Sequence, residues 1–256
     1  MKGVVLTGVL VAVLFVMSGC GSSEPTSSAS AEQRFQHAKQ LYDQGDYLEA
    51  LNEFTVVTLQ FSGSAFASDA QFYLGECRYN REEYLLAAFE YQQLKKNYPA
   101  SPKSPDAQYK LAMSYYMLSP KASLDQQYTR KAIDEFQSFV EYYPASPHAA
   151  DADQKIRELT SKLAGKQLQT ARLYATLGYT KAALFYFDDV IERYHDTESG
   201  PLAYVEKAEF LLQKKRYADA NDVITRFLSL YPNNVLRARA EQVRNEIAKV
   251  LAGKNG

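Results

Sequence analysis

The chain has 256 residues, of which 46% are hydrophobic and 23% charged, and its formal net charge at pH 7 is −1. This apolar content is typical of a folded globular domain and excludes a wholly disordered chain. The near-zero charge balance also argues against a nucleic-acid-binding protein, which needs a basic surface.

Residues 1–19 have the composition of a secretory signal peptide. Lys2 supplies a positive start, and an almost unbroken apolar run extends from Val4 to Met17. A permanent membrane-spanning helix needs roughly 20 apolar residues, so this shorter run fits the apolar region of a signal peptide. We therefore expect an exported protein.

The small residues Ser18 and Gly19 before Cys20 resemble the lipobox of bacterial lipoproteins, although Met17 stands where Leu or Val is usual. The resemblance implies that Cys20 is lipidated and becomes the first mature residue. The alternative is an ordinary signal peptide with a chance cysteine. Gly21, rather than Asp, follows the cysteine, which by resemblance to enterobacterial sorting rules favours the outer membrane.

Residues 20–31 comprise this predicted anchor and a segment of small polar residues without apolar periodicity. Such a composition is typical of a flexible linker. We expect a tether that holds the folded part near the membrane.

From residue 32 onward, one pattern of small, apolar and proline positions recurs. In its clearest copy Gly75 precedes Ala87, Tyr91 and Leu94, which share one helix face, and Pro99 closes the pattern. We expect two packed helices, with Gly75 small so that Ala87 can approach it closely. Pro99 would end the second helix because proline lacks the backbone N–H.

Four further copies precede or follow this one at related spacing. The equivalent positions are Ala38, Ala50, Phe54, Val57 and Ser62 in copy one, Ala112, Ala132, Phe136, Phe139 and Pro144 in copy three, Ala171, Ala183, Phe187, Val190 and His195 in copy four, and Ala208, Ala220, Ile224, Phe227 and Pro232 in copy five. Copy three has a longer turn between its helices, roughly Pro120 to Tyr128. One hairpin of this size cannot bury enough apolar surface alone, so the copies must stack.

The pattern resembles the tetratricopeptide repeat, although the tryptophan frequent in that repeat is absent. The resemblance implies an all-α solenoid of five helical hairpins that form a right-handed superhelix with a concave binding surface.

Two aromatic series recur every 37 residues in copies one to three. They are Phe35, Phe72 and Tyr109, and Tyr42, Tyr79 and Tyr116. The two members in each copy are seven residues apart, so they lie on one face of the first helix of the pair. In the tetratricopeptide repeat this face lines the inside, and the series predict an aromatic peptide-binding groove. The alternative is that these rings fill seams between successive helices.

Copies four and five replace the aromatic positions with Leu168, Ala175, Val205 and Leu212. We therefore expect two parts with different roles. Residues 32–165 would carry the groove, and residues 166–256 would form the last two repeats and a C-terminal helix that dock a partner.

The lipobox, the five copies, the long third turn and a long helix from Ala149 to Ala164 together resemble the BamD family of the outer-membrane β-barrel assembly machine. The resemblance covers about Glu32 to Asn234. It implies a lipid-anchored periplasmic scaffold whose N-terminal repeats bind the aromatic C-terminal segments of unfolded barrel proteins. Its C-terminal repeats would dock the barrel-forming subunit of the machine.

Several charged and aromatic residues are candidates for these contacts. Lys39 and Arg78 could bind the terminal carboxylate of a peptide; solvated charges are the alternative, which we favour for Arg78. Tyr186 and Arg193 are candidates for partner docking. The segment Arg237 to Lys249 is a further candidate, with a plain solvated helix as the favoured alternative.

The sequence contains no motif of a catalytic or metal site. His37, His148 and His195 fall in different copies, and Cys77 lies inside a predicted helix as a small buried hydrophobe. Phosphate-binding glycine loops and nucleophile motifs are absent. We expect a binding protein without metal or cofactor rather than an enzyme.

Two other kinds of envelope protein use such repeats. One is a lipoprotein that organises the cell wall, resembling the coordinator of the Tol-Pal system, which shares the repeat ending Tyr-Pro-x-Ser-Pro. That relative usually begins with a coiled coil, whereas here the repeats follow the tether directly. The other is an enzyme accessory protein or a pilot protein of a secretin.

Overall fold

The structure is a computed structural model that describes residues 29–252. In this range the chain forms eleven helices and no strand, which confirms the all-α prediction. The helices are α1 (Ala31–Gln44), α2 (Tyr47–Gln60), α3 (Ala67–Asn80), α4 (Tyr84–Asn97), α5 (Ser104–Leu118), α6 (Gln127–Tyr142), α7 (Ala149–Thr176), α8 (Thr180–Arg193), α9 (Ser199–Gln213), α10 (Tyr217–Leu230) and α11 (Arg237–Ala252). The predicted signal peptide, Cys20 and most of the tether lie outside the described residues.

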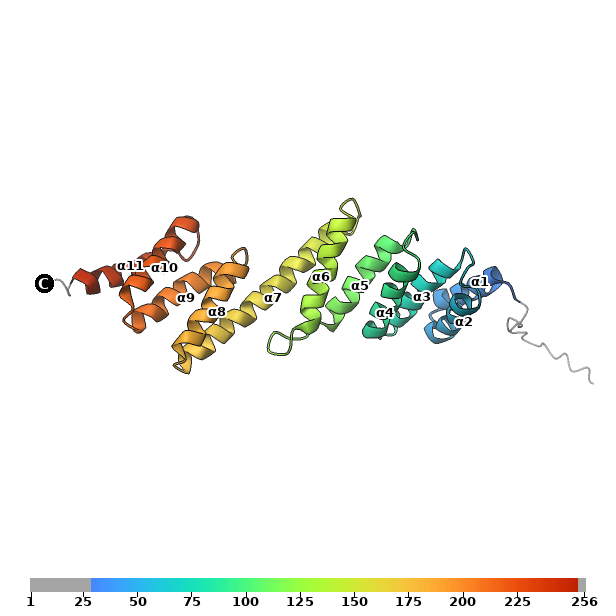
Figure 1. The fold of residues 1–256 in the computed structure, drawn as a ribbon, viewed down its shortest axis with the longest axis horizontal. Helices are drawn as coiled ribbons and strands as arrows, with labels where there is room; N and C mark the ends of the chain where they lie inside the picture. The colour runs from blue at the N-terminus through green and yellow to red at the C-terminus, as the bar shows by residue number, and fades with distance from the viewer. Residues whose placement is uncertain (1–28, 253–256) are drawn as a thin grey trace, which may run out of the picture.

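Successive helices pack side by side along one long axis (Figure 1). Each predicted hairpin is present, from the pair α1 and α2 to the pair α9 and α10. Helix α11 packs on α10 and α9 and caps the C-terminal end of the solenoid. A stacked repeat needs such a closing element, because its last apolar face would otherwise meet water.

The helix pairs fit closely because small residues occupy the crossings. Ala50, Ala87 and Ala132 are fully buried at the predicted positions. The nearest neighbour of Gly75 is the ring of Tyr91, since a Cβ built at this position would lie 2.4 Å from Cε1 of Tyr91. The ring of Tyr91 therefore requires the glycine.

In four pairs, the turn after the first helix contains a residue with left-handed backbone. Gly45 and Gly178 have φ of 89° and 79°, and Glu82 and Lys215 have φ of 60° and 61°. This conformation reverses the chain into the second helix and is costly for a residue with a side chain. Only two of the four positions use the residue that adopts it without strain.

Helix α7 differs from the prediction of a helix ending at Ala164. It continues without interruption for 28 residues, from Ala149 to Thr176. The segment contains one glycine, Gly165, and no proline, so nothing in it stops a helix. Leu163 and Leu168 lie on either side of the boundary predicted after residue 165, and both are buried in one apolar cluster that extends from α5 to α9.

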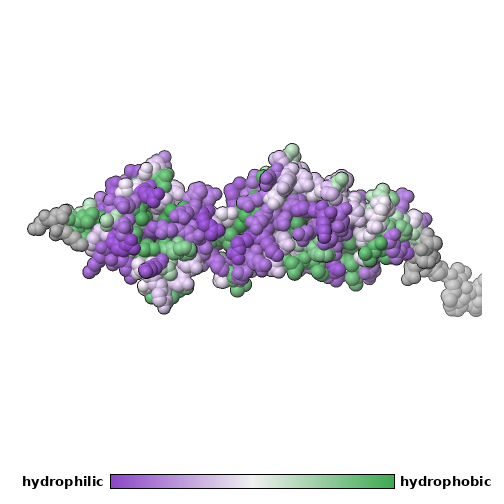
Figure 2. All heavy atoms as spheres, in the orientation of Figure 1, coloured by the Kyte–Doolittle hydropathy of each residue, from purple (hydrophilic) through white to green (hydrophobic). Residues whose placement is uncertain are grey.

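None of the helices within residues 29–252 has the length and apolar content to cross a bilayer. Hydrophilic residues cover much of the face seen in Figure 2, with hydrophobic patches between them, several along the edge below α4. Helix α4 exposes Leu85, Leu86 and Phe89.

Candidate peptide-binding and docking surfaces

The first aromatic series lies mainly in the seams of the fold. Phe35 and Phe72 are each 8% exposed. The ring of Phe35 lies 5.6 Å from that of Phe54, and the ring of Phe72 lies 5.8 Å from that of Tyr91. For these two residues the structure corresponds to the seam alternative, because their ring faces are covered by the paired helix.

Tyr109, the third member of this series, is half-buried. Its ring stacks on His148 at 4.3 Å, and its hydroxyl donates a hydrogen bond of 2.5 Å to Asp151 of α7. Burial, followed by the hydrogen bond to Asp151, raises the pKa of Tyr109. The hydroxyl is therefore a proton donor across the physiological range.

The second series, Tyr42, Tyr79 and Tyr116, forms what we call the inner tyrosine row. All three side chains are partly exposed, and each has a lysine ammonium over its ring. The distances from Nζ to the ring centroid are 5.5 Å for Lys39 and Tyr42, 4.8 Å for Lys110 and Tyr79, and 4.5 Å for Lys155 and Tyr116. Only Lys39 among these lysines was predicted, because Lys110 and Lys155 are brought to the row by the next inner helix.

Glu76 of the second repeat links the first and third repeats beneath this row. It is 9% exposed, accepts a hydrogen bond of 2.5 Å from the Tyr91 hydroxyl, and lies 3.1 Å from Nζ of Lys110. The Tyr42 hydroxyl lies 3.5 Å away from the same carboxylate. Burial, and next the charge of Glu76, raises the pKa of Tyr42. A buried carboxylate with these partners fixes the lysine and the ring in place.

The predicted carboxylate-binding residues both have acidic partners. Lys39 forms an ion pair with Asp43 on the next turn of α1. Arg78 donates a hydrogen bond of 2.6 Å to Glu83, which lies in the turn before α4. This bond is the largest cause of the lowered pKa of Glu83. Arg78 thus holds the turn of its own repeat, and its side chain is 26% exposed rather than freely solvated.

Tyr186 lies within an exposed aromatic group at the turn between α7 and α8. Its ring stacks on that of Tyr174 at 5.4 Å, with an angle of 12° between their planes. Phe185 and Tyr179 beside it are 65% and 62% exposed. A hollow of about 600 Å³ opens here against Tyr174 and Tyr179.

Leu173 and Leu177, each 56% exposed, extend this group along the end of α7. We call Leu173, Tyr174, Leu177, Tyr179, Phe185 and Tyr186 the α7–α8 surface. Of these residues only Tyr186 was predicted, since a repeat pattern predicts which positions are buried and leaves the others unassigned. Exposed apolar groups of this extent mark contact surfaces in soluble domains.

The remaining docking candidates are charged residues with local partners. Arg193, near the end of α8, lies 3.1 Å from Asp189 and 5.7 Å from the ring of Tyr194. Arg237 lies 3.0 Å from Glu241, and α11 buries Ala240, Val243 and Ile247. The segment Arg237 to Lys249 is therefore an amphipathic closing helix with a solvated outer face.

The chemistry of catalytic sites is not assembled in the part of the chain that the structure describes. No group of three or more His, Cys, Asp or Glu residues there could hold a metal ion. Cys77 is fully buried, and burial raises the pKa of its thiol to about 12. A thiol in that state is a packing residue rather than a nucleophile.

Comparison with known proteins connects these surfaces to a family. Residues 27–215 match the family model YfiO, described as outer membrane lipoprotein. The chain is 28% identical over 214 residues to the outer membrane protein assembly factor BamD of Caulobacter vibrioides, covering 82% of this chain and 70% of that protein. It is 25% identical over 236 residues to the BamD of Rickettsia prowazekii, covering 91% and 94%.

Among solved structures, a TPR repeats protein from Bacteroides fragilis aligns with 86% of this chain and 99% of its own length, at 12% identity and a TM-score of 0.48.

Proposed function

The chain belongs to the YfiO family of outer membrane lipoproteins, and on this premise we propose that it is a lipid-anchored periplasmic scaffold of the machine that assembles outer-membrane β-barrels. Both curated relatives are named outer membrane protein assembly factors. The predicted lipobox at Cys20 supports attachment through a lipid, and the short tether keeps the repeats close to the membrane.

The observation that carries the peptide-binding part of this proposal is the inner tyrosine row. Three partly exposed rings recur at a constant interval of 37 residues, each with an ammonium group beside it. Rings of this kind offer large contact area at small entropic cost, and lysines attract a carboxylate. The row therefore suits an extended segment that ends in an aromatic residue.

The α7–α8 surface supports the second part, docking of the barrel-forming subunit on the C-terminal repeats. Its six large side chains come from the end of α7, the turn that follows it and the first half of α8. Arg193 lies seven residues after Tyr186, on the same face of α8. Aromatic residues bordered by an arginine are typical of energetically dominant contacts in protein interfaces.

Copurification from native membranes tests the proposal. We expect the full-length chain to bring down a barrel protein with periplasmic domains, and Phe185→Ser to reduce the yield at least about tenfold, the scale of a lost interface anchor. Tyr142→Ser is the matched control, because Tyr142 is 72% exposed on α6, away from this surface. Recovery of peptidoglycan-linked partners instead would favour the cell-wall-organising alternative.

A further inference from the structure

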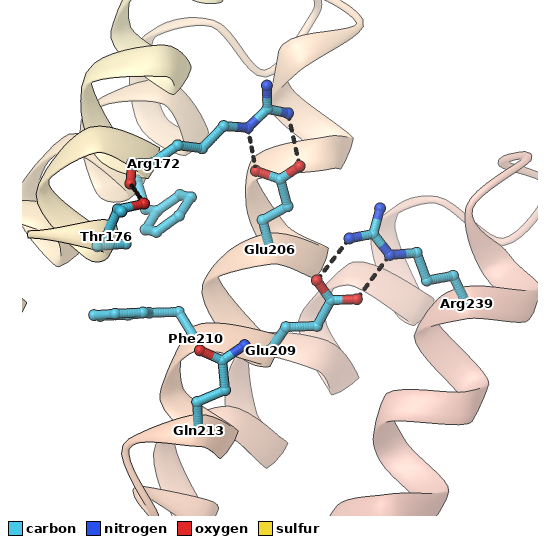
Figure 3. Close-up of a pocket in the computed structure, with 9 residues that line it drawn as sticks. Arg172, Thr176, Glu206, Glu209, Phe210, Gln213 and Arg239 are labelled. Carbon is cyan, nitrogen blue, oxygen red and sulfur yellow. Dashed lines mark hydrogen bonds and ion pairs between the residues drawn. The ribbon is translucent and has the colours of Figure 1, made fainter.

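A second hollow opens on the C-terminal repeats, where residues of α7, α8, α9 and α11 line it (Figure 3). Its volume is about 280 Å³. The residues that decide its chemistry are Arg172 of α7, Glu206, Glu209, Phe210 and Gln213 of α9, and Arg239 of α11. The α7–α8 surface and the inner tyrosine row contribute none of these residues.

Two arginines in this hollow are held rigidly by glutamates. Nε and Nη2 of Arg172 donate hydrogen bonds of 2.7 Å to the two carboxylate oxygens of Glu206. Nε and Nη2 of Arg239 donate bonds of 2.7 and 2.6 Å to Glu209. Such paired bonds fix the guanidinium plane. In both forks the third nitrogen, Nη1, points away from the glutamate (Figure 3).

The two members of each pair are not equally accessible. The side chains of Arg172 and Arg239 are 47% and 42% exposed, whereas those of Glu206 and Glu209 are 17% and 30% exposed. The arginines therefore present more of their side chains to solvent than the glutamates that neutralise their charge. Beside the hollow, Lys214 supplies a further positive charge, with Nζ 5.3 Å from the centroid of the Phe210 ring.

The inner wall of the hollow is apolar. Phe187 and Phe210 are 2% and 5% exposed, and their rings lie 6.2 Å apart. Gln213 and Thr176 stand beside them and can exchange hydrogen bonds with a peptide backbone. A ligand that fits must offer negative charge at the rim and an apolar group toward the phenylalanines.

We propose that this hollow binds an extended polypeptide segment in which a carboxylate side chain neighbours an apolar one. The two guanidiniums stand on separate helices of the same hollow, α7 and α11, so a segment with two carboxylates can use both. The ligand needs no free C-terminus, which separates this site from the inner tyrosine row. The inference is thus independent of the proposed binding of barrel-protein termini.

Fluorescence anisotropy with blocked peptides tests the site. The probe is a labelled ten-residue peptide of alternating Glu and Phe, acetylated and amidated, and its counterparts carry Gln or Lys in place of Glu. With the full-length chain in detergent, we expect the Glu peptide to bind about tenfold more tightly than the Gln peptide and the Lys peptide to bind least. Affinity should fall as salt rises, since the rim is exposed.

Substitution of both members of an Arg–Glu pair tests whether the peptide binds at that pair, without creating an unpaired charge. The double variant Arg172→Gln with Glu206→Gln should lower the affinity for the Glu peptide about tenfold, which is the scale of a lost charge-assisted contact. The second double variant, Arg239→Glu with Glu209→Arg, swaps the two charges and keeps a salt bridge. Because the more exposed position is then acidic, this variant should bind the Lys peptide relatively better than the unaltered chain does. Arg237→Gln, on an exposed arginine of α11 paired with Glu241, is the control and should change nothing.

Three results would overturn the assignment. These are equal affinity for the three peptides, unchanged binding in both paired variants, and complete displacement of the Glu peptide by millimolar inorganic phosphate at constant ionic strength. Tyr79→Ala should leave the blocked Glu peptide bound, so failure of the inner tyrosine row and failure of this hollow are distinguishable.

Discussion

Gly75 shows, at the scale of one residue, how closely the helices of a pair are fitted. An added Cβ would lie 2.4 Å from Cε1 and 2.6 Å from Cδ1 of Tyr91, whose side chain is fully buried. Overpacking of this kind costs about 1–3 kcal/mol. We expect Gly75→Ala to lower the free energy of unfolding by this amount, measured by urea denaturation followed by circular dichroism.

Gly165 provides the matched control, because it is also a glycine within a helix. Nothing lies within 4 Å of a Cβ built there. Gly165→Ala therefore gains helix propensity without a clash and should raise the free energy of unfolding by up to about 1 kcal/mol. Equal effects of the two substitutions would show that the Tyr91 contact does not determine the choice of glycine.

Lys215 illustrates a residue whose backbone conformation is unfavourable. Its φ of 61° lies in the left-handed region, which Gly45 and Gly178 occupy at the equivalent turns with φ of 89° and 79° and without a side chain. We expect Lys215→Gly to raise the thermal midpoint, corresponding to about 0.5–1 kcal/mol, since relief of left-handed strain exceeds the added freedom of the unfolded chain.

Lys214 is the control for this substitution, because its φ is −81°. Lys214→Gly relieves no backbone strain and should lower the thermal midpoint of unfolding. A fall in both variants would mean that the unfolded-state entropy of glycine outweighs the strain at Lys215.

The inner helices show, at the scale of the element, which part of the candidate site a sequence can predict. The spacing of seven residues placed Phe72 and Tyr79 on one face of the same helix, α3. The spacing could not predict how deeply each ring is buried, because burial depends on the angle at which the second helix of the pair crosses the first. Phe72 lies under α4, and Tyr79 lies nearer the rim with Lys110 over it. Lys110 belongs to the next repeat, and the spacing within one repeat gives no indication that it lies over Tyr79.

This difference in depth decides which variant tests peptide binding. Phe72→Ala would remove a buried ring and cost about 3–5 kcal/mol of stability, so lost binding would be ambiguous. Tyr79→Ala should instead retain the helical circular dichroism signal and weaken binding of peptides ending in an aromatic residue by about 1–3 kcal/mol.

Isothermal titration calorimetry measures this loss, and Tyr142→Ala serves as the control because it removes an exposed tyrosine of α6. Lys110→Met should give a loss that shrinks when the peptide carboxylate is amidated. Unchanged affinity in Tyr79→Ala would leave the row with a structural role alone.

Helix α7 extends beyond its predicted end at Ala164, and the reason again lies in which signals a sequence contains. Prolines mark the ends of three second helices, near Pro99, Pro144 and Pro232, and the helix ends were predicted there correctly. Between Ala149 and Thr176 no such signal exists, and the expectation of a uniform repeat imposed a break. Continuity there depends on the absence of a stop and on burial of Leu159, Leu163 and Leu168.

Helix α7 determines, at the scale of the whole molecule, whether the two parts behave as one body. Its first half packs on α6 and its second half on α8 and α9. One apolar cluster runs along it, from Ala112 to Phe210. Tyr116 of the inner tyrosine row and Tyr174 and Tyr186 of the α7–α8 surface all pack against this one cluster. We therefore expect a single cooperative unfolding transition.

Gly165→Pro tests this coupling. Proline inside a helix removes a hydrogen bond and clashes with the preceding turn, at a cost of about 3 kcal/mol or more. We expect this variant to unfold in two steps by calorimetry, because the break separates the core of α5 and α6 from that of α8 and α9. Ser123→Pro, in the exposed turn between α5 and α6, is the control and should keep one transition. If Gly165→Pro also unfolded in one step at the midpoint of the unaltered chain, the two parts would have to be joined by contacts other than α7.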